Sequence, residues 1–325
     1  MSKELAMSER KARAALVYNP VKIDRDAVDS VLTAIESEVG WEPTLWLETS
    51  VEDPGQGQAR QAREAGVDVV IAAGGDGTVR AVAEALRGSG LPLALLPSGT
   101  GNLLARNLDL TLEDLEHSLR VALTGTDRPI DAAVMTLQRD GGARETHTFV
   151  VMAGMGLDAR MLSETDDDLK KKAGWLAYVS AITRVLRDPN ELTFSFRLDG
   201  KAPRRVKAHT IMIGNCGTLP ANILLLPDAA VDDGVLDIVL LAPKSLAGWV
   251  QALTKIVWEN GILRRLPGGR DLPTKKVDAL VYSTGKDLDL RLTAPQEVEL
   301  DGDPFGLVTG LRVRVDPGSL MVRVP

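Results

Sequence analysis

The chain has one cysteine, Cys216, and three histidines among its 325 residues. A single cysteine excludes an intramolecular disulfide and any zinc site built from several thiolates. The histidines, at positions 117, 147 and 209, are scattered and form no H-E-x-x-H pattern. We therefore expect neither disulfide stabilisation nor a histidine metal centre.

Long apolar runs and an excess of positive charge are also missing. No segment offers the roughly 18 uninterrupted apolar residues of a membrane-spanning helix, and the start of the chain, MSKELAMSERKARAALVYNP, lacks the apolar stretch of a signal peptide. With 38 basic and 45 acidic side chains the formal charge is −7, which excludes a general nucleic-acid binder, because neutralising phosphates requires a basic face. We expect a cytoplasmic protein whose membrane contact is peripheral and comes from a local patch.

The segment 67–86, VDVVIAAGGDGTVRAVAEAL, is the most informative stretch of the chain. Its first seven residues form a β-branched apolar run typical of a strand buried on both faces, and apolar residues then recur at helical spacing. Between strand and helix lies the loop Gly74-Gly75-Asp76-Gly77-Thr78. Glycines let backbone N–H groups approach an anion, and the helix N-terminus adds partial positive charge, so the loop predicts a phosphate site. The alternative is a tight turn with Thr78 as the helix N-cap.

Asp76 favours the phosphate site with a divalent cation. A carboxylate beside a phosphate is repelled unless a cation bridges the two or the carboxylate is protonated, so its presence suggests magnesium–nucleotide chemistry. The loop differs from the dinucleotide fingerprint G-x-G-x-x-G, because Arg80 occupies the third glycine position, and no G-x-x-x-x-G-K-[ST] motif occurs.

The first part of the chain alternates strands and helices. Apolar runs at 14–18, 44–47 and 91–96 predict further strands, and 26–39, 58–65 and a segment from about Leu103 predict helices. This alternation predicts a parallel sheet with ligands at the carboxyl ends of its strands. Three turns then meet at one edge, the Asn19-Pro20 turn, the loop 74–78 and the loop 97–102, which together indicate a nucleotide site.

From about Asp131 the pattern changes to short alternating strands separated by turn residues, which favours an antiparallel sandwich. The expected strands are 132–137, 146–152, 192–198, 206–213, 235–241, 288–292, 298–300, 311–315 and 320–324, with helices at 168–187 and 245–258. A chain of this length with 44% hydrophobic residues can build two cores. We predict an α/β domain with a parallel sheet over residues 1–131 and a β-rich sandwich domain over residues 132–325.

The motifs, taken in order, resemble those of the diacylglycerol kinase catalytic family, bacterial lipid kinases related to sphingosine kinases and NAD kinases. The matching segments are VYNP (17–20), AAGGDGTV (72–79), LLPSGTGNLLARNL (95–108), AGMGLDA (153–159), GNCG (214–217), LLPDAAVDDGVLDIVLL (225–241) and VELDGDP (298–304). The resemblance implies the NAD kinase/diacylglycerol kinase-like fold and ATP-dependent phosphorylation of a lipid hydroxyl, most simply diacylglycerol to phosphatidic acid, at a membrane surface.

The resemblance also implies site residues. ATP contacts, together with the second glycine loop, fall on Asn19, Pro20, Val21, Lys22, Ile23, Thr49, Gly74, Gly75, Asp76, Gly77, Thr78, Val79, Arg80, Ser98, Gly99, Thr100 and Asn102. Asp76 would act through Mg²⁺ at the triphosphate, and Asp303 would be the general base. A structural Mg²⁺ would be held by the carboxylate of Asp233 and by main-chain oxygens of Ala230 and Val235.

The chain departs from the family pattern at three places. Asp303 replaces the usual Glu and is one methylene shorter, Leu103 stands where many members have Asp, and Lys22-Ile23 replaces a common Ser-Gly pair.

Several alternatives stay open. Residues 301–304 could be a plain β-turn, residues 232–234 a hairpin turn, and the loop 154–158 a bulge. Basic and aromatic residues at 170–172, 175, 178, 249, 258 and 264–265 could hold a membrane surface, or the tryptophans could be core and the lysines a solvated face. A kinase for a sphingoid or other lipid alcohol, an NAD kinase-like enzyme and a nucleotide- or lipid-binding regulator are the alternative functions. Oligomeric state is open, with a homodimer as one option.

Overall fold

The computed structural model describes residues 10–156, 191–219, 223–256 and 278–325. Two compact units make up the chain: unit 1 is Met1–Ala132 with Pro317–Pro325, and unit 2 is Ala133–Asp316. The expected division gave all of residues 132–325 to the second domain. The structure differs because the end of the last strand returns to unit 1, where Val322 pairs with Leu93.

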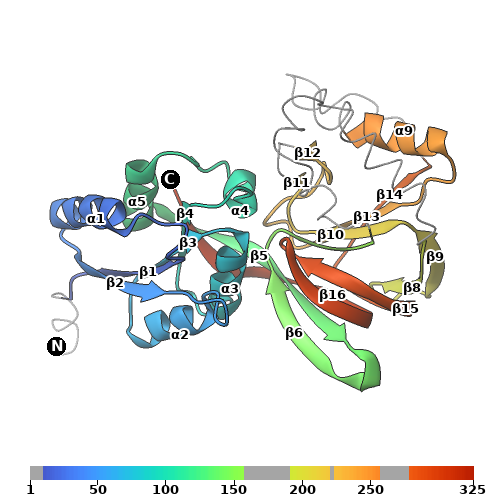
Figure 1. Cartoon of the computed structure of the whole chain (residues 1–325), viewed down its shortest axis with the longest axis horizontal. Helices are drawn as coiled ribbons and strands as arrows, with labels where there is room; N and C mark the ends of the chain where they lie inside the picture. Colours follow the sequence, from blue (N-terminus) through green and yellow to red (C-terminus); the bar gives the residue numbers. More distant parts are fainter. Residues whose placement is uncertain (1–9, 157–190, 220–222, 257–277) are drawn as a thin grey trace, which may run out of the picture. The chain divides into compact units, whose positions relative to one another are not determined.

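Unit 1 is built on a parallel sheet with strand order β2-β1-β3-β4 (Figure 1). These strands are β1 (Arg13–Tyr18), β2 (Glu42–Glu48), β3 (Val69–Gly74) and β4 (Leu93–Pro97). The end of β16 (Asp303–Val324) continues the sheet beside β4. All six residues of β3 are buried, which explains the continuous apolar run, since a strand covered on both faces has no polar side.

Helices cover both faces of this sheet. The helices of unit 1 are α1 (Arg25–Val39), α2 (Gln56–Glu64), α3 (Asp76–Leu86), α4 (Leu103–Asn107) and α5 (Leu115–Thr124). Helices α1 and α5 pack together on one face, and α2 packs against α3 on the other (Figure 1). Helix α1 begins after Asp24, whose carboxylate accepts the N–H of Ala27, and ends at Gly40 in the left-handed region.

Unit 2 is an antiparallel β structure. Its strands are β5 (Thr126–Gln138), which begins in unit 1, β6 (Arg144–Phe149), β7 (Met152–Met155), β8 (Leu192–Leu198), β9 (Arg204–Ala208), β10 (Thr210–Gly214), β11 (Thr218–Leu219), β12 (Ile223–Leu224), β13 (Leu236–Leu241), β14 (Leu280–Gly285), β15 (Asp287–Leu300) and most of β16. The main order is β14-β13-β10-β7-β15-β16. Strand β15 also pairs with β8, and β8 pairs with β9. Helix α9 (Leu246–Thr254) and a short 3-10 helix, η2 (Asp140–Gly142), complete the described elements.

The expected fold class, an α/β domain followed by a β-rich sandwich, is confirmed. Several element boundaries were wrong. The expected strand 206–213 is two strands, β9 and β10, and the expected pairs 288–292/298–300 and 311–315/320–324 are the continuous strands β15 and β16. Helix α5 and strand β14 were not predicted. The expected helix 168–187 and the end of the helix 245–258 lie outside the described residues. None of the described helices is long and apolar enough to cross a membrane.

Candidate active site

The loops that follow β1, β2, β3 and β4 meet at one edge of the unit 1 sheet. The N–H of Asn19 donates to the carbonyl of Ala73 (2.9 Å), and the N–H of Thr49 donates to the carbonyl of Tyr18 (2.9 Å). The loop after β4 joins them, since the N–H of residue 98 donates to the carbonyl of residue 74 (3.3 Å). The predicted nucleotide residues that follow these strands therefore lie together, as the carboxyl ends of parallel strands require.

The first loop of this edge is a turn built around Asn19. The side-chain oxygen of Asn19 accepts the N–H of Val21 (3.0 Å), and its carbonyl accepts the N–H of Lys22 (3.0 Å). Pro20, Val21 and Lys22 are exposed, whereas Ile23 packs partly against the core of the α1 face. Of the five predicted residues here, the exposed three can face a ligand, and Ile23 anchors the turn.

The two glycine loops touch each other through their backbones. A Cβ atom on Gly99 would lie 2.8 Å from the Cα of Gly75, and one on Gly74 would lie 2.6 Å from the hydroxyl of Thr78. Any larger residue at Gly99 would push the loops apart. Gly75 is the N-cap of α3, and Thr78 is buried inside the first turn, so the alternative with Thr78 as N-cap is wrong. Gly77 and Val79 belong to the same first turn.

Asp76 is the first residue of α3, and its carboxylate connects the two loops. Its Oδ1 accepts the N–H of Leu103 at 2.6 Å, and a Cβ on Gly101 would collide with its Oδ2. Asn102 precedes α4 in the left-handed region, and its side chain closes the second loop, accepting from the N–H of Gly99 (3.0 Å) and donating to the carbonyl of Gly99 (2.9 Å). The carboxylate is thus positioned by hydrogen bonding.

Arg80 was predicted to contact ATP. In the structure its side chain is 6% exposed and its guanidinium forms an ion pair with Glu84 at 3.3 Å, one turn further along α3. The ion pair holds the guanidinium beside α3, and contact of Arg80 with ATP stays a prediction.

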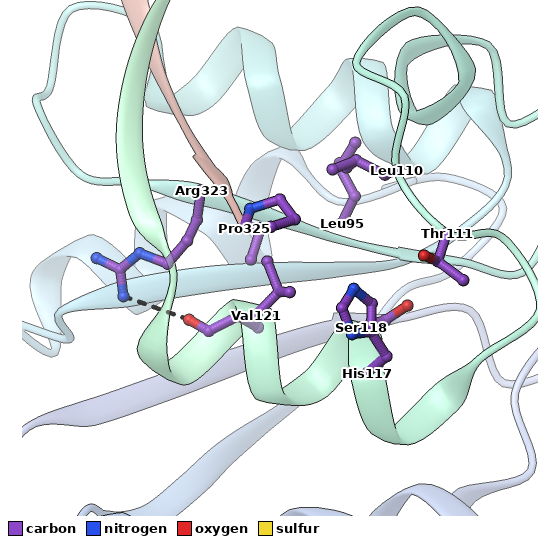
Figure 2. Close-up of a pocket in the computed structure, with 10 residues that line it drawn as sticks. Leu95, Leu110, Thr111, His117, Ser118, Val121, Arg323 and Pro325 are labelled. Atoms are coloured by element: carbon purple, nitrogen blue, oxygen red, sulfur yellow. Dashed lines mark hydrogen bonds between the residues drawn. The ribbon is translucent and has the colours of Figure 1, made fainter.

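Two small pockets lie in unit 1. One lies directly behind the glycine loops and is lined by Asp76, Val79, Leu95, Leu96, Pro97, Asn102, Leu104 and Ala105. The other lies between β4, α5 and the end of the chain, where Arg323 donates to the carbonyl of Ala122 (3.3 Å) (Figure 2). None of the predicted nucleotide residues lines this second pocket, so the pocket behind the glycine loops is the one that belongs to the candidate site.

In unit 2, Asp303 begins β16 directly after a two-residue turn. Leu300 and Asp303 form the pair that closes the β15–β16 hairpin, and the turn residues Asp301 and Gly302 have φ angles of 48° and 88°. Positive φ at both central positions is typical of the tight hairpin turn favoured by Asp-Gly. The turn is therefore real, and it fixes where the backbone of Asp303 begins, while the proposed role of Asp303 stays a prediction.

Asp301 has no predicted role of its own beyond this turn. In the structure the residue is buried, with 3% of its surface exposed, and its carboxylate accepts three backbone N–H groups, those of Val150, Val151 and Met152, each at 2.9 Å. A buried carboxylate within a turn motif is unusual, since charges are buried only when well paired. The sequence carried no signal that separates Asp301 from Asp303.

The predicted metal position is a turn with acidic surroundings. Residues 231–234 form a turn before β13, and the carboxylate of Asp233 accepts the N–H of Val235 (3.1 Å). Burial raises the pKa of Asp237 to about 6, and the nearby charges of Asp233 and Asp228 add to this shift. Asp237 was missed, although an acid inside the apolar run of β13 is a recognisable signal.

The acidic residues around this turn, Asp228, Asp233 and Asp237, fit a hard cation, because Mg²⁺ prefers oxygen ligands and neutralises the charge of neighbouring carboxylates. The predicted set combines Asp233 with carbonyls of Ala230 and Val235. Within the described ranges, no three His, Cys, Asp or Glu side chains are grouped as a metal site, so carbonyls would have to complete the coordination.

The expected membrane patch is described only in part. Trp249 is 4% exposed, so it belongs to the core, as the alternative interpretation held. The basic and aromatic residues at 170–178, 258 and 264–265 lie outside the described residues.

Both units of the chain match known protein families. The family model "Diacylglycerol kinase catalytic domain" matches residues 13–135, and the model "YegS C-terminal NAD kinase beta sandwich-like domain" matches residues 150–324. The chain is also 32% identical to the protein of Pseudomonas aeruginosa (strain UCBPP-PA14) described as "Probable lipid kinase YegS-like", over 97% of this chain and 95% of that protein. The chain belongs to the YegS-like, diacylglycerol kinase-like lipid kinase family.

More distant relatives of this lipid kinase are also described as diacylglycerol kinases. The "Diacylglycerol kinase" of Bacillus subtilis (strain 168) is 24% identical over 92% of each chain. A crystal structure of a diacylglycerol kinase from Bacillus anthracis str. Sterne has 19% identity and a TM-score of 0.67, covering 96% of this chain and 97% of that one. At this identity the structural likeness establishes the fold.

Proposed function

We propose that this chain transfers the γ-phosphate of ATP to a lipid hydroxyl, with diacylglycerol as the acceptor and Mg²⁺ as the cation. The observation that carries the proposal is the meeting of the Gly75 and Gly99 loops beside the Asp76 carboxylate, within a lipid kinase family. Close backbone approach leaves N–H groups rather than side chains to face an anion. We propose diacylglycerol as the acceptor because the relative from Bacillus subtilis is described as a diacylglycerol kinase.

Phosphoryl transfer requires the protein to position the reactants and to neutralise charge on the phosphates, and it requires little covalent chemistry from side chains. The glycine loops would hold the phosphates through backbone N–H groups. When bound, Mg²⁺ neutralises charge on the phosphates, and Asp76 is the residue that would hold it. Asp303 would accept the proton of the acceptor hydroxyl. Because the acceptor is a lipid, we place the reaction at a membrane or micelle surface.

The test is a panel of acceptors with labelled ATP, Mg²⁺ and mixed micelles. The panel contains diacylglycerol, a sphingoid base and another lipid alcohol, and NAD is assayed in parallel. Label in diacylglycerol supports the proposal. Label in another lipid alone overturns the choice of diacylglycerol, and label in NAD alone overturns lipid phosphorylation. ATP binding without transfer to any acceptor would indicate a regulator. Asp76→Asn is the control for background transfer.

A further inference from the structure

The buried carboxylate of Asp301 organises three separate segments of unit 2. Three consecutive backbone N–H groups, from Val150 to Met152, converge on it at 2.9 Å each. The backbone adds a fourth bond, since the N–H of Asp301 donates to the carbonyl of Met152 (2.8 Å). Successive N–H groups aimed at one point form an anion-binding concavity. Here the anion is supplied by the chain itself.

Residues 150–151 also bind the loop after β10, through their carbonyl groups. The carbonyl of Val150 accepts from the side-chain amide of Asn215 (3.3 Å) and from the thiol of Cys216 (3.4 Å). The carbonyl of Val151 accepts from the backbone N–H groups of Asn215 (2.9 Å) and Cys216 (3.1 Å). One face of residues 150–151 therefore binds Asp301, and the carbonyls bind the loop after β10.

The turn alone does not require this arrangement. Asp199 and Gly200 also have positive φ angles, 51° and 70°, and the Asp199 carboxylate accepts the N–H groups of Lys286 (2.7 Å) and Asp287 (3.0 Å). Asp199 is exposed, so it keeps its solvation. Burying the charge of Asp301 has a desolvation cost that three N–H groups must offset. Because the three N–H groups offset this cost only while they point at the carboxylate, the arrangement holds the turn in one geometry.

We infer that Asp301 is a positioning residue for phosphoryl transfer, which sets the location of Asp303 relative to the loop 150–152. Only Gly302 separates Asp301 from Asp303 in the chain, so a shift of the Asp301 carboxylate and its three N–H partners, here called the clamp, would also shift Asp303. This inference rests on the proposed function and adds to it a second acid that never touches the substrate.

The experiment is a double-mutant cycle in the full chain. Asp301→Asn keeps the size of the side chain but removes the charge and turns an N–H donor toward N–H groups. We expect it to lower kcat about tenfold or more while the KM for ATP changes less than about twofold. In the Asp303→Asn background the same substitution should lower kcat no further, because its effect acts through Asp303.

Asp199→Asn is the matched control. It removes a carboxylate from the same type of turn, at the opposite end of β15, and should leave kcat within about twofold of wild type. The inference is overturned if Asp301→Asn retains as much kcat as Asp199→Asn, or if its loss is the same with and without Asp303. Where Asp301→Asn does not fold, Gly302→Ala takes its place with the same expectations. A Cβ on Gly302 meets nothing within 4 Å and strains only the turn.

A second readout separates this inference from the proposed function. Hydrogen exchange at the N–H groups of Val151 and Met152 should accelerate in Asp301→Asn and not in Asp199→Asn. A wild type that phosphorylates no lipid overturns the proposed function, and the exchange data then still test the clamp. An active wild type with unchanged protection in Asp301→Asn overturns the inference alone.

Discussion

Asp76 accepts the N–H of Leu103 at 2.6 Å, across 27 positions of the chain. Leu103 is the first residue of α4, whose N-cap Asn102 makes no side-chain capping bond of its own. The carboxylate therefore supplies an acceptor to the start of α4 while sitting in the first turn of α3, where the helix dipole favours negative charge. Its structural and its proposed catalytic contributions can be separated by substitution.

Asp76→Asn should keep the structure and lose the activity. An amide oxygen can still accept the N–H of Leu103, so we expect the unfolding free energy to change by less than about 1 kcal/mol. Without the charge, Mg²⁺ at the phosphates loses its carboxylate partner, and kcat should fall by a factor on the order of 10² or more. Thermal unfolding and steady-state phosphorylation measure the two effects. Asp76→Ala, which also loses the acceptor, should be less stable than Asp76→Asn; equal stability would contradict the capping role.

Alanine at the two glycine loops should separate folding from ligand binding. Gly75 has an ordinary negative φ of −87°, and a Cβ there has its nearest neighbour at 4.0 Å. Gly75→Ala should therefore cost about 1 kcal/mol or less in stability yet weaken ATP binding, because a methyl group would keep a phosphate away from the backbone N–H groups of this loop. Gly99→Ala should destabilise unit 1 directly through its 2.8 Å clash with Gly75. Calorimetric titration with ATP measures the affinity of both variants, and thermal melts measure their stability. Unaltered ATP affinity in Gly75→Ala would argue against a phosphate at this loop.

Much of unit 1 could be predicted because its strands, helices and loops are each marked by residues that are neighbours in the sequence. Strands such as β3 are buried on both faces and therefore appear as continuous apolar runs, and glycine loops follow them at the sheet edge. Even so, α5 was missed, although Asp114 caps it by accepting the N–H of His117 at 2.9 Å and apolar residues follow at helical spacing.

Unit 2 was less predictable because long-range pairing overrides local turn signals. Residues 293–297 include Pro295, and residues 316–319 include Asp316, Pro317 and Gly318. Both segments were expected to break their strands. In the structure β15 absorbs its irregularity as a register shift between Arg291 and Gln296, and β16 carries Gly318 at a φ of 60°. Similarly, which acid of Asp301-Gly302-Asp303 is buried depends on the N–H groups of a loop some 150 positions away.

Magnesium should stabilise the chain through the Asp233 turn as well as through nucleotide. In the absence of ATP, adding Mg²⁺ should raise the melting temperature, with a gain of about 2.7 kcal/mol at 100 times the dissociation constant. Asp233→Ala should abolish this Mg²⁺-dependent gain, because it removes the predicted carboxylate ligand. Asp76→Ala is the control and should retain the gain. An identical Mg²⁺ response in wild type and Asp233→Ala would remove Asp233 from the metal site.

The Cys216 thiol should make stability fall at alkaline pH. Burial, reinforced by the charge of Asp301, raises the pKa of the Cys216 thiol far above its ordinary range, whereas the thiol of the unfolded chain has a pKa of about 8.5. Above that pH the unfolded state loses a proton that the folded state keeps, so the unfolding free energy falls by up to about 1.4 kcal/mol per pH unit. Denaturant unfolding from pH 7.5 to 10 should show a shallower decline in Cys216→Ala than in wild type. Parallel declines would show that the thiol ionises equally in both states.

The length of the acid at position 303 offers the most direct test of the base. Asp303→Asn should keep ATP affinity and lower kcat by a factor on the order of 10² or more, because an amide accepts no proton at neutral pH. Asp303→Glu restores a carboxylate one methylene longer, the residue usual in the family that the sequence resembles, and should retain far more activity than Asp303→Asn. Single-turnover phosphorylation with the preferred lipid, alongside ATP titrations, measures both variants. Should Asp303→Asn turn over like wild type, the proton must leave through another group, and the positioning of this turn would lose its catalytic meaning.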